Sequence, residues 1–204
     1  LDAARQRGAQ VARLATGSKN VAVHKTAARA GMRRVASVIP LEAQALASSE
    51  GFASLTRLGS DDWPQVSVRI LNSAALVEMG GLYGAGWVWH RLTPDKLRTH
   101  LEHGQVLVLR QSSGEIVATA ILSDVDQKWK ALEVAYADGS EHHVQMLAHA
   151  LQQCAASLQL QKVEVMIPAA SSLRQAFVQA GYTPEMEADA EIWVYELELK
   201  GAIV

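Results

Sequence analysis

Residues 145–182, QMLAHALQQCAASLQLQKVEVMIPAASSLRQAFVQAGY, constrain the fold more than any other stretch of this chain. Apolar residues spaced by three and four predict a helix with one apolar stripe: Met146, Leu147, Ala150, Leu151, Cys154 and Leu158. A β-branched run at residues 163–167 predicts a strand that ends at Pro168. A second helix is predicted from the serines at 171–172 to Gly181, a residue suited to a left-handed stop. The apolar stripe of the first helix must therefore pack on a sheet.

The start of the chain shows the same order of elements. Residues 1–32 and 151–182 are equally long, and each segment ends in Ala-Gly followed by an apolar residue, Met32 or Tyr182. Few residues are identical, so the repeat depends mainly on pattern. It predicts an internal duplication, with a partial second copy at the N-terminus.

A change in composition separates the two parts of the chain. Residues 34–39 predict a mostly apolar strand that ends at Pro40. Residues 46–60, rich in Ala, Ser and Gly, are the best candidate linker. We therefore divide the chain into a first segment, residues 1–45, a linker, and a second unit, residues 61–204.

The second unit predicts a mixed α/β sheet. Asp61 or Asp62 caps a helix, the Gly80–Gly86 cluster predicts a loop, and Trp87 and Trp89 are expected on one strand face. A helix starts at Thr93-Pro94 and stops at Gly104, and strands follow at 106–109, 116–122, 129–136 and 192–199. The first two of these strands, joined by Ser112-Ser113-Gly114, should form an antiparallel hairpin. The prediction is a largely antiparallel sheet flanked by helices.

Composition excludes several classes of protein. A net charge of −2 and a pI of about 6.4 argue against a nucleic-acid binder, although Arg and Lys crowd the first 34 residues. The single cysteine, Cys154, allows no internal disulfide and favours a reducing, cytoplasmic setting.

No apolar run approaches the roughly 20 residues that span a membrane. The charged start excludes a secretory signal, and its lack of an initiator methionine suggests that residues of the natural protein precede Leu1.

The order of elements, with W-V-W before LTPDKLRTHLEHG and a helix ending in FVQAGY, resembles the GNAT superfamily of N-acetyltransferases. The opening RLATGSKNVAVHKTAARAGM is similar to the second half of the acetyl-CoA domain in that family. Asn20 matches the asparagine of the turn, which contacts the pantetheine arm, Gly31 matches the helix end and Met32 the aromatic position after it. The resemblance implies a tandem GNAT protein, with acetyl-CoA as cosubstrate, whose first domain is represented only by its later half.

The resemblance also places a pyrophosphate loop at residues 137–143 of the second unit, ADGSEHH, before a helix expected from Val144. Gly139 and Ser140 are its candidate cofactor-binding residues, because free amides at a helix start bind phosphate. Asp138 and Glu141 fall where the family has a basic or amide residue and a glycine. Each carboxylate about 4 Å from a phosphate would cost roughly 4 kcal/mol at an effective dielectric of about 20. We therefore expect this unit to bind acetyl-CoA weakly or not at all.

Acid–base chemistry has few candidates. The family commonly takes its acid from a tyrosine four residues before the helix-end glycine, and here those positions are Ala27 and Phe177. Glu133 is a conceivable catalytic base, although a solvent-facing structural role explains it at least as well. Histidine pairs such as His100 and His103 lack a third ligand, so no metal site is expected.

Two functions follow from the sequence. The first is an N-acetyltransferase that moves an acetyl group from acetyl-CoA to a primary amine, on a small molecule or a peptide, with a degenerate second domain. The second is a non-catalytic GNAT-like binding or dimerisation module. Neither function needs nucleic acid or a membrane, and a homodimer is left open.

Overall fold

The computed structural model describes residues 2–47, 55–85, 87–123, 130–187 and 190–199. The first segment forms α1 (Asp2–Gln6), β1 (Val11–Gly17), α2 (Val21–Arg29) and β2 (Arg33–Gln44). The middle of the chain forms β3 (Leu55–Leu58), a 3-10 turn (Ser60–Asp62), α3 (Trp63–Leu71), α4 (Ala74–Glu78), β4 (Leu82–Ala85), β5 (Val88–Arg91) and α5 (Pro94–Glu102). The remainder forms β6 (Val106–Arg110), β7 (Ile116–Leu122), β8 (Ala131–Gly139), α6 (Glu141–Ser157), β9 (Lys162–Pro168), α7 (Leu173–Gln179), β10 (Thr183–Pro184) and β11 (Ile192–Glu198).

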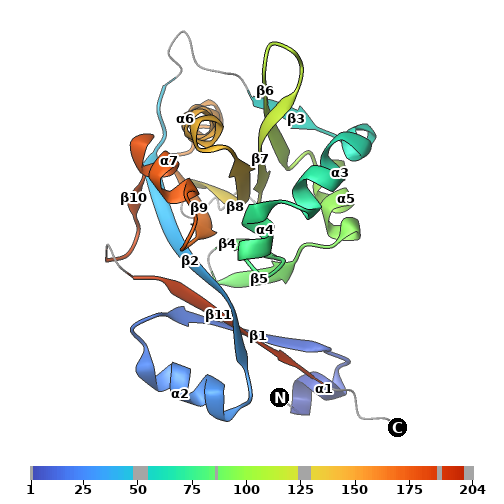
Figure 1. The fold of residues 1–204 in the computed structure, drawn as a ribbon, viewed down its shortest axis with the longest axis vertical. Coiled ribbons are helices and arrows are strands. Elements are labelled where there is room, and N and C mark those ends of the chain that lie inside the picture. Colours follow the sequence, from blue (N-terminus) through green and yellow to red (C-terminus); the bar gives the residue numbers. More distant parts are fainter. Residues whose placement is uncertain (1, 48–54, 86, 124–129, 188–189, 200–204) are drawn as a thin grey trace.

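One mixed sheet organises the molecule. Its strand order is β1-β11-β2-β9-β8-β7-β6-β3, with β10 paired to β2 beside this path. The β8–β9 pair is parallel and the other pairs along the path are antiparallel. Helices α6 and α7 lie on one side of the main body, and α3 to α5 lie on the other with the β4–β5 hairpin (Figure 1). The mixed, largely antiparallel fold predicted from sequence is therefore confirmed.

Two β-α-β units interlock in this sheet. Strands β1 and β2, joined by α2, run in the same direction, and β11 fills the place between them. Strands β9 and β11, joined by α7, also run in the same direction, and β2 fills the place between them. Each unit thus supplies the strand that completes the other.

The two units correspond in detail. All seven residues of β1 pair with β11, and all seven residues of β9 pair with β2. Gly31 and Gly181 both end their helices with positive φ, +75° and +88°. The amide that follows each glycine donates to the carbonyl five residues earlier at 3.0 Å, Met32 to Ala27 and Tyr182 to Phe177. This is the left-handed helix stop that the Ala-Gly ending predicts.

A buried carboxylate ties the interlocked strands to the hairpin. Glu196 of β11 is only 3% exposed and accepts hydrogen bonds from Arg13 of β1 at 2.9 Å and from Arg91 of β5 at 3.1 Å. The guanidinium of Arg33, on β2, lies 4.0 Å away. Beside this cluster, apolar residues of β2, β4, β5, β9 and β11, together with the residue that ends α4, form a separate small core: Ala36, Val38, Met79, Leu82, Trp89, Met166, Ile192 and Val194.

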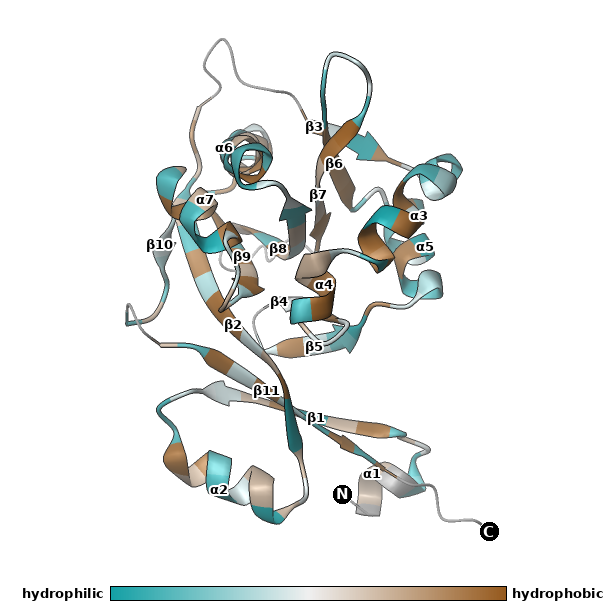
Figure 2. Ribbon diagram, viewed as in Figure 1, coloured by the Kyte–Doolittle hydropathy of each residue, from teal (hydrophilic) through white to brown (hydrophobic). Residues whose placement is uncertain are grey.

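The main core lies above this small core. It is built largely from β6, β7, β8, α6 and α7, and the ribbons of β6 and β7 are brown along most of their length (Figure 2). The predicted helix–strand–helix of residues 145–182 is confirmed as α6, β9 and α7, and so is the antiparallel hairpin β6–β7. No helix in the described ranges is long and apolar enough to cross a membrane.

Three local predictions were wrong. Strand β2 does not end at Pro40 but continues to Gln44, and its pairing with β11 already ends at Val38, so the missing N–H of the proline need not remove a bond there. The glycine cluster is not a loop throughout, because it contributes the hairpin strand β4. Trp87 lies before β5 and is 61% exposed, whereas Trp89 lies on β5 and is 5% exposed, so the two indoles do not share a strand face.

The range predicted as a linker is partly structured. Residues 55–58 within it form β3, which pairs with β6 at the edge of the sheet.

The β4–β5 hairpin requires a glycine at position 84, inside β4. A Cβ at this position would collide with the Val88 carbonyl oxygen and the Trp89 ring.

We predict that Glu196→Gln lowers the free energy of unfolding by about 2 kcal/mol, because it removes the buried charged acceptor of the hydrogen bonds from the partly exposed Arg13 and the exposed Arg91. The matched control is Glu198→Gln on the same strand, which replaces a side chain that is 73% exposed and should change stability by less than about 0.5 kcal/mol. Urea unfolding followed by circular dichroism measures both. Equal effects of the two substitutions would show that the buried cluster has no special role.

Candidate functional site

The parallel strands β8 and β9 open apart within the sheet. Their pairing runs from Ala131–Lys162 to Val134–Val165 and then ends, although both strands continue. Beyond this point β8 stays paired with β7, and β9 stays paired with β2. A register shift in the β7–β8 pairing places an extra residue, Ala135, at the point of separation. The opening therefore begins at a β-bulge.

The N-terminus of a long helix follows the opened part of β8. Helix α6 begins at Glu141 rather than at the predicted Val144, and β8 remains paired as far as Gly139, so Ser140 alone joins the strand to the helix. Gly139 has φ +153°, and a Cβ there would lie 3.0 Å from the Ala118 Cβ and the Val117 carbonyl oxygen. Glycine thus allows β8 to stay close to β7 up to the first turn of the helix.

Ser140 is the N-cap residue of α6, but its hydroxyl does not cap the helix amides. The Ser140 Oγ instead lies 2.8 Å from the His143 Nδ1, and the His143 Nε2 lies 3.3 Å from the Gln111 side-chain amide. Glu141 is exposed in the first turn, where its negative charge interacts favourably with the helix dipole but repels an incoming anion. Of the predicted site residues, Gly139 and Ser140 do lie at a helix N-terminus.

Asp138 lies among polar groups between β8 and α3. It pairs with Thr119 of β7, and the Arg69 guanidinium of α3 and the Tyr136 hydroxyl act on its carboxyl. Burial raises the pKa of Asp138 above 3.8, while Arg69 and the Gly139 amide act in the opposite direction.

Sequence reasoning missed the buried polar cluster around Tyr136. The Tyr136 hydroxyl donates to the Ser73 Oγ at 2.7 Å, and Ser73 also caps α4 by accepting from the Leu76 amide at 3.1 Å. The Arg69 Nη2 donates to the Val117 carbonyl oxygen at 2.9 Å. The bulge at Ala135 alters the strict alternation of β8, and nothing in the sequence signals a bulge there.

Glu133 lies on β8 two residues before the bulge. It accepts a hydrogen bond from the Ser123 hydroxyl at 2.6 Å and lies opposite Glu164 of β9. Lys162 bridges Glu164 and Glu42 at 2.6 and 2.8 Å, so this side of the sheet is a network of charges. A catalytic role for Glu133 stays a prediction.

Asn20 lies at a second candidate position, the turn between β1 and α2. Its side chain caps α2 by accepting from the Val23 amide at 3.3 Å. The turn borders a cleft of ≈ 550 Å³ that is lined by Gly17, Ser18, Lys19, Asn20, Met186, Glu187 and Ala190. Lys19 and Glu187 form an ion pair of 2.5 Å on this border. The structure therefore places Asn20 far along the sheet from Gly139 and Ser140, since β1 and β8 are separated by β11, β2 and β9.

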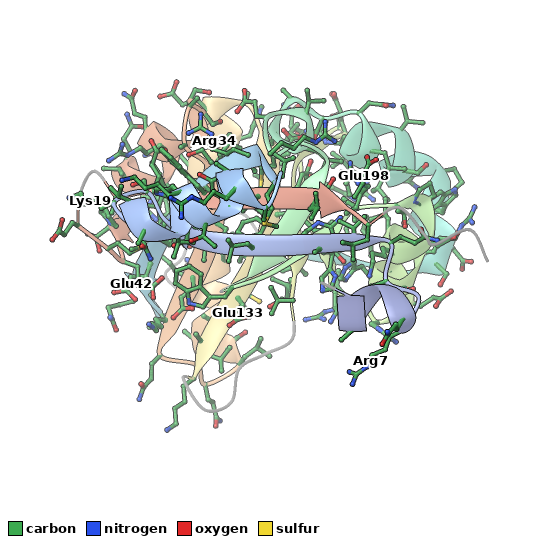
Figure 3. The ribbon with its side chains drawn as sticks, turned by 90° about the horizontal axis from the view of Figure 1, so that it is seen from below. Arg7, Lys19, Arg34, Glu42, Glu133 and Glu198 are labelled. Atoms are coloured by element: carbon green, nitrogen blue, oxygen red, sulfur yellow. The ribbon has the colours of Figure 1, made fainter. Side chains whose placement is uncertain are left out.

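Helix α2 packs on β11 beside the cleft. The His24 Nε2 donates to the Ser18 carbonyl oxygen at 2.9 Å, so its Nδ1 is the acceptor for the Tyr195 hydroxyl at 3.0 Å. Trp193 lies against His24 and also carries the Arg34 guanidinium over its ring. Seen from below, Lys19 lies at the turn before α2, whereas Arg7 lies near α1 on the other side of the molecule (Figure 3).

The positions of the family tyrosine are filled by core residues. Ala27 is 1% exposed and Phe177 is fully buried. In the described part of the chain, no group of three or more His, Cys, Asp or Glu side chains is placed to hold a metal ion.

Comparison with known proteins gives the fold. No family model matches the sequence, and no curated protein matches it. A GCN5-related N-acetyltransferase from Sphaerobacter thermophilus is similar in structure, with a TM-score of 0.59 over 92% of this chain at 10% identity. A GNAT-family acetyltransferase from Colwellia psychrerythraea has a TM-score of 0.55 over 90% of this chain, also at 10% identity. The chain has the GNAT fold.

The GNAT fold here covers only part of the similar proteins. The chain spans 59% and 64% of the lengths of the two acetyltransferases. The N-myristoyltransferase of Saccharomyces cerevisiae, solved with bound myristoyl-CoA, has a TM-score of 0.50 at 10% identity, over 81% of this chain and 48% of its own. These similarities establish the GNAT architecture of the sheet and not a substrate.

We predict that Asp138→Asn stabilises the protein increasingly as the pH rises above about 4. The folded pKa of Asp138 is raised above 3.8, so the folded state binds more protons there, and wild-type stability falls as the carboxyl ionises. The Asp138→Asn variant has no carboxyl to ionise at this position, so its free energy of unfolding does not show this fall. Unfolding free energies at pH 4 and pH 7 test it, with Asp95→Asn, whose carboxyl is 92% exposed, as control. A difference between wild type and Asp138→Asn that does not change with pH would contradict the prediction.

Proposed function

We propose that this chain belongs to an acyl-CoA-dependent N-acyltransferase of the GNAT type, which moves an acetyl group from acetyl-CoA to a primary amine. The observation that carries the proposal is the open cleft beside the β1–α2 turn at Asn20, in a sheet of GNAT architecture. The opening between β8 and β9, which begins at a bulge and leads to a helix N-terminus, shows the same architecture in the second unit. An extended chain with amide groups, such as a pantetheine arm, can hydrogen-bond to the separated strand edges, and a helix N-terminus favours phosphate. The similar yeast enzyme with bound myristoyl-CoA supports an acyl-CoA as donor.

The chain carries two such units in this proposal. Residues 1–45 are the later half of a first GNAT-like domain, residues 46–60 join the domains, and residues 61–204 are the second domain. The equivalent helix ends at Gly31 and Gly181 and the interlocked strand pairs support the duplication. The turn at Asn20 then occupies the same place in the first unit as the turn between β9 and α7 in the second.

The first unit is the better candidate for a working donor site. Asn20 borders an open cleft in which it can contact an amide-bearing chain. At the second opening, Glu141 places a negative charge in the first turn of α6, and the Ser140 hydroxyl is engaged by His143. The second domain therefore binds acetyl-CoA weakly and serves to support the first unit. If the second opening is used at all, Glu133 is its candidate base.

One observation favours a non-catalytic module instead. Both positions that carry the acid tyrosine in the family are occupied by buried apolar residues, Ala27 and Phe177, so neither unit has a hydroxyl there. A protein that binds acyl-CoA tightly but releases no free CoA thiol with any amine would fit this second function.

We predict that acetyl-CoA at a hundred times its dissociation constant raises the melting temperature by about 5 to 10 °C, since it adds about 2.7 kcal/mol. Asn20→Ser, which keeps a capping oxygen but shortens the side chain, should weaken binding about tenfold in calorimetric titrations. Glu141→Gln should strengthen binding at the second site, and Glu102→Gln on α5 is the control. The proposal fails if acetyl-CoA produces no shift in wild type or in Glu141→Gln.

A further inference from the structure

A short strap, residues 183–187, leads from α7 towards β11. Its first two residues form β10, which pairs with residues 41–42 of β2 (Figure 1). The Glu185 amide then donates to the Pro40 carbonyl oxygen at 3.1 Å. Strand β9, by comparison, pairs with seven residues of β2. The strap is thus attached to the sheet by a ladder of two residue pairs and one further hydrogen bond.

The end of the strap forms one wall of the cleft at the β1–α2 turn. Met186 lines this cleft beside Gly17, where an added Cβ would lie 3.7 Å from the Met186 Cε. Met186 also packs against the small core, and Glu187 reaches Lys19 in the ion pair of 2.5 Å. An exposed ion pair of this kind contributes little to stability. The position of this wall therefore depends on how firmly the strap is attached to β2.

Carboxylates of three neighbouring strands lie in a row beside the strap. Glu133 of β8 is paired with Glu164 of β9, and Glu164 is paired with Glu42 of β2. Glu42 is in turn paired with Thr183, the first residue of the strap. Directly paired residues point to the same face of a sheet, so the three carboxylates share one face. Lys162 bridges Glu164 and Glu42 and supplies one positive charge, which does not neutralise the row.

Glu185 places a fourth carboxylate against this row. It is half-buried, and among the residues that the structure describes no hydrogen bond or ion pair reaches its carboxyl. Burial raises the pKa of Glu185 above 4.5, the three carboxylates of the row raise this pKa further, and the Lys162 charge lowers it. We propose that Glu185 makes the strap sensitive to pH: the protonated carboxyl allows the strap to stay docked on β2, and the ionised carboxylate, repelled by the row, releases it.

Docking of the strap should weaken as the pH rises. In a released strap the pKa of Glu185 is close to its ordinary value, 4.5, so the docked form binds the proton more tightly. Below pH 4.5 both forms carry the proton and docking is strongest, and docking weakens as the pH rises from 4.5 through the raised pKa of the docked carboxyl. Release frees the Met186 wall of the cleft. Only the consequence for access of an acyl-CoA rests on the proposed function.

Hydrogen exchange of the Glu185 amide, which donates to Pro40, measures docking directly. Its protection factor in the wild-type chain should fall by about threefold or more between pH 4 and pH 7. Glu185→Gln should keep the strap docked, with a protection factor that does not change with pH. The matched control is Glu187→Gln on the same strap. It removes a side chain that is 76% exposed and should leave the fall with pH in place.

Four outcomes would overturn the proposal. The first three are a wild-type protection factor that does not fall, an equal fall in Glu185→Gln, and loss of the fall in Glu187→Gln. The fourth is a difference between wild type and Glu185→Gln that appears equally at the amides of β9, which would mean that the whole sheet unfolds. Acetyl-CoA plays no part in this measurement. Failure of the switch is therefore distinguishable from failure of the proposed acyl-CoA binding.

Discussion

The insertion of β2 and β11 between each other's neighbours is the constraint on which the sheet depends. Without β11, the unit formed by β1, α2 and β2 has an empty place between its two strands, and the same holds for β9, α7 and β11 without β2. The charges of the inserted strand β11 are also opposite in sign to those of its neighbours. The first 34 residues contain eight Arg and Lys residues and one acidic residue, and β11 brings Glu196 and Glu198 into their midst. The buried Glu196 then also connects both units to β5 through Arg91.

Local signals in the sequence were enough to predict the elements of this arrangement but not their pairing. The Ala-Gly endings at residues 30–31 and 180–181 specify a helix stop within a few residues, and both stops formed as expected. The pairing of β1 with β11 joins residues more than 170 positions apart, and no local pattern encodes which strand fills which place. For the same reason the crowding of basic residues in the first 34 positions did not reveal their partners, which are Glu196 for Arg13 and Arg33 and Glu187 for Lys19.

The candidate site shows the same division between local and long-range information. The junction of strand and helix near residue 140 was predictable from glycine and small polar residues, and only its boundary was misplaced. The direction of Asp138 was not predictable. It depends on the bulge at Ala135, which changes the faces that the following residues of β8 present, and on Arg69, which reaches the carboxyl from α3. The local sequence therefore placed Asp138 in the predicted loop as a charge that opposes pyrophosphate, but did not reveal that its neighbours are Arg69, Thr119 and Tyr136.

The opening between β8 and β9 is a consequence of the interlocked strands and not a separate feature. Past the bulge, β8 is held by β7 through Ala118 to Ile121, whereas β9 is held by β2 through residues 38–40. Strand β2 in turn is fixed on its other side by β11. The two strands that border the opening are thus held by different neighbours, β8 by β7 and β9 by β2, and β2 comes from the first 45 residues of the chain. The N-terminal unit therefore shapes the opening between β8 and β9, although its own residue Asn20 lies three strands away from that opening. Without β2, strand β9 would lack the neighbour that holds it apart from β8.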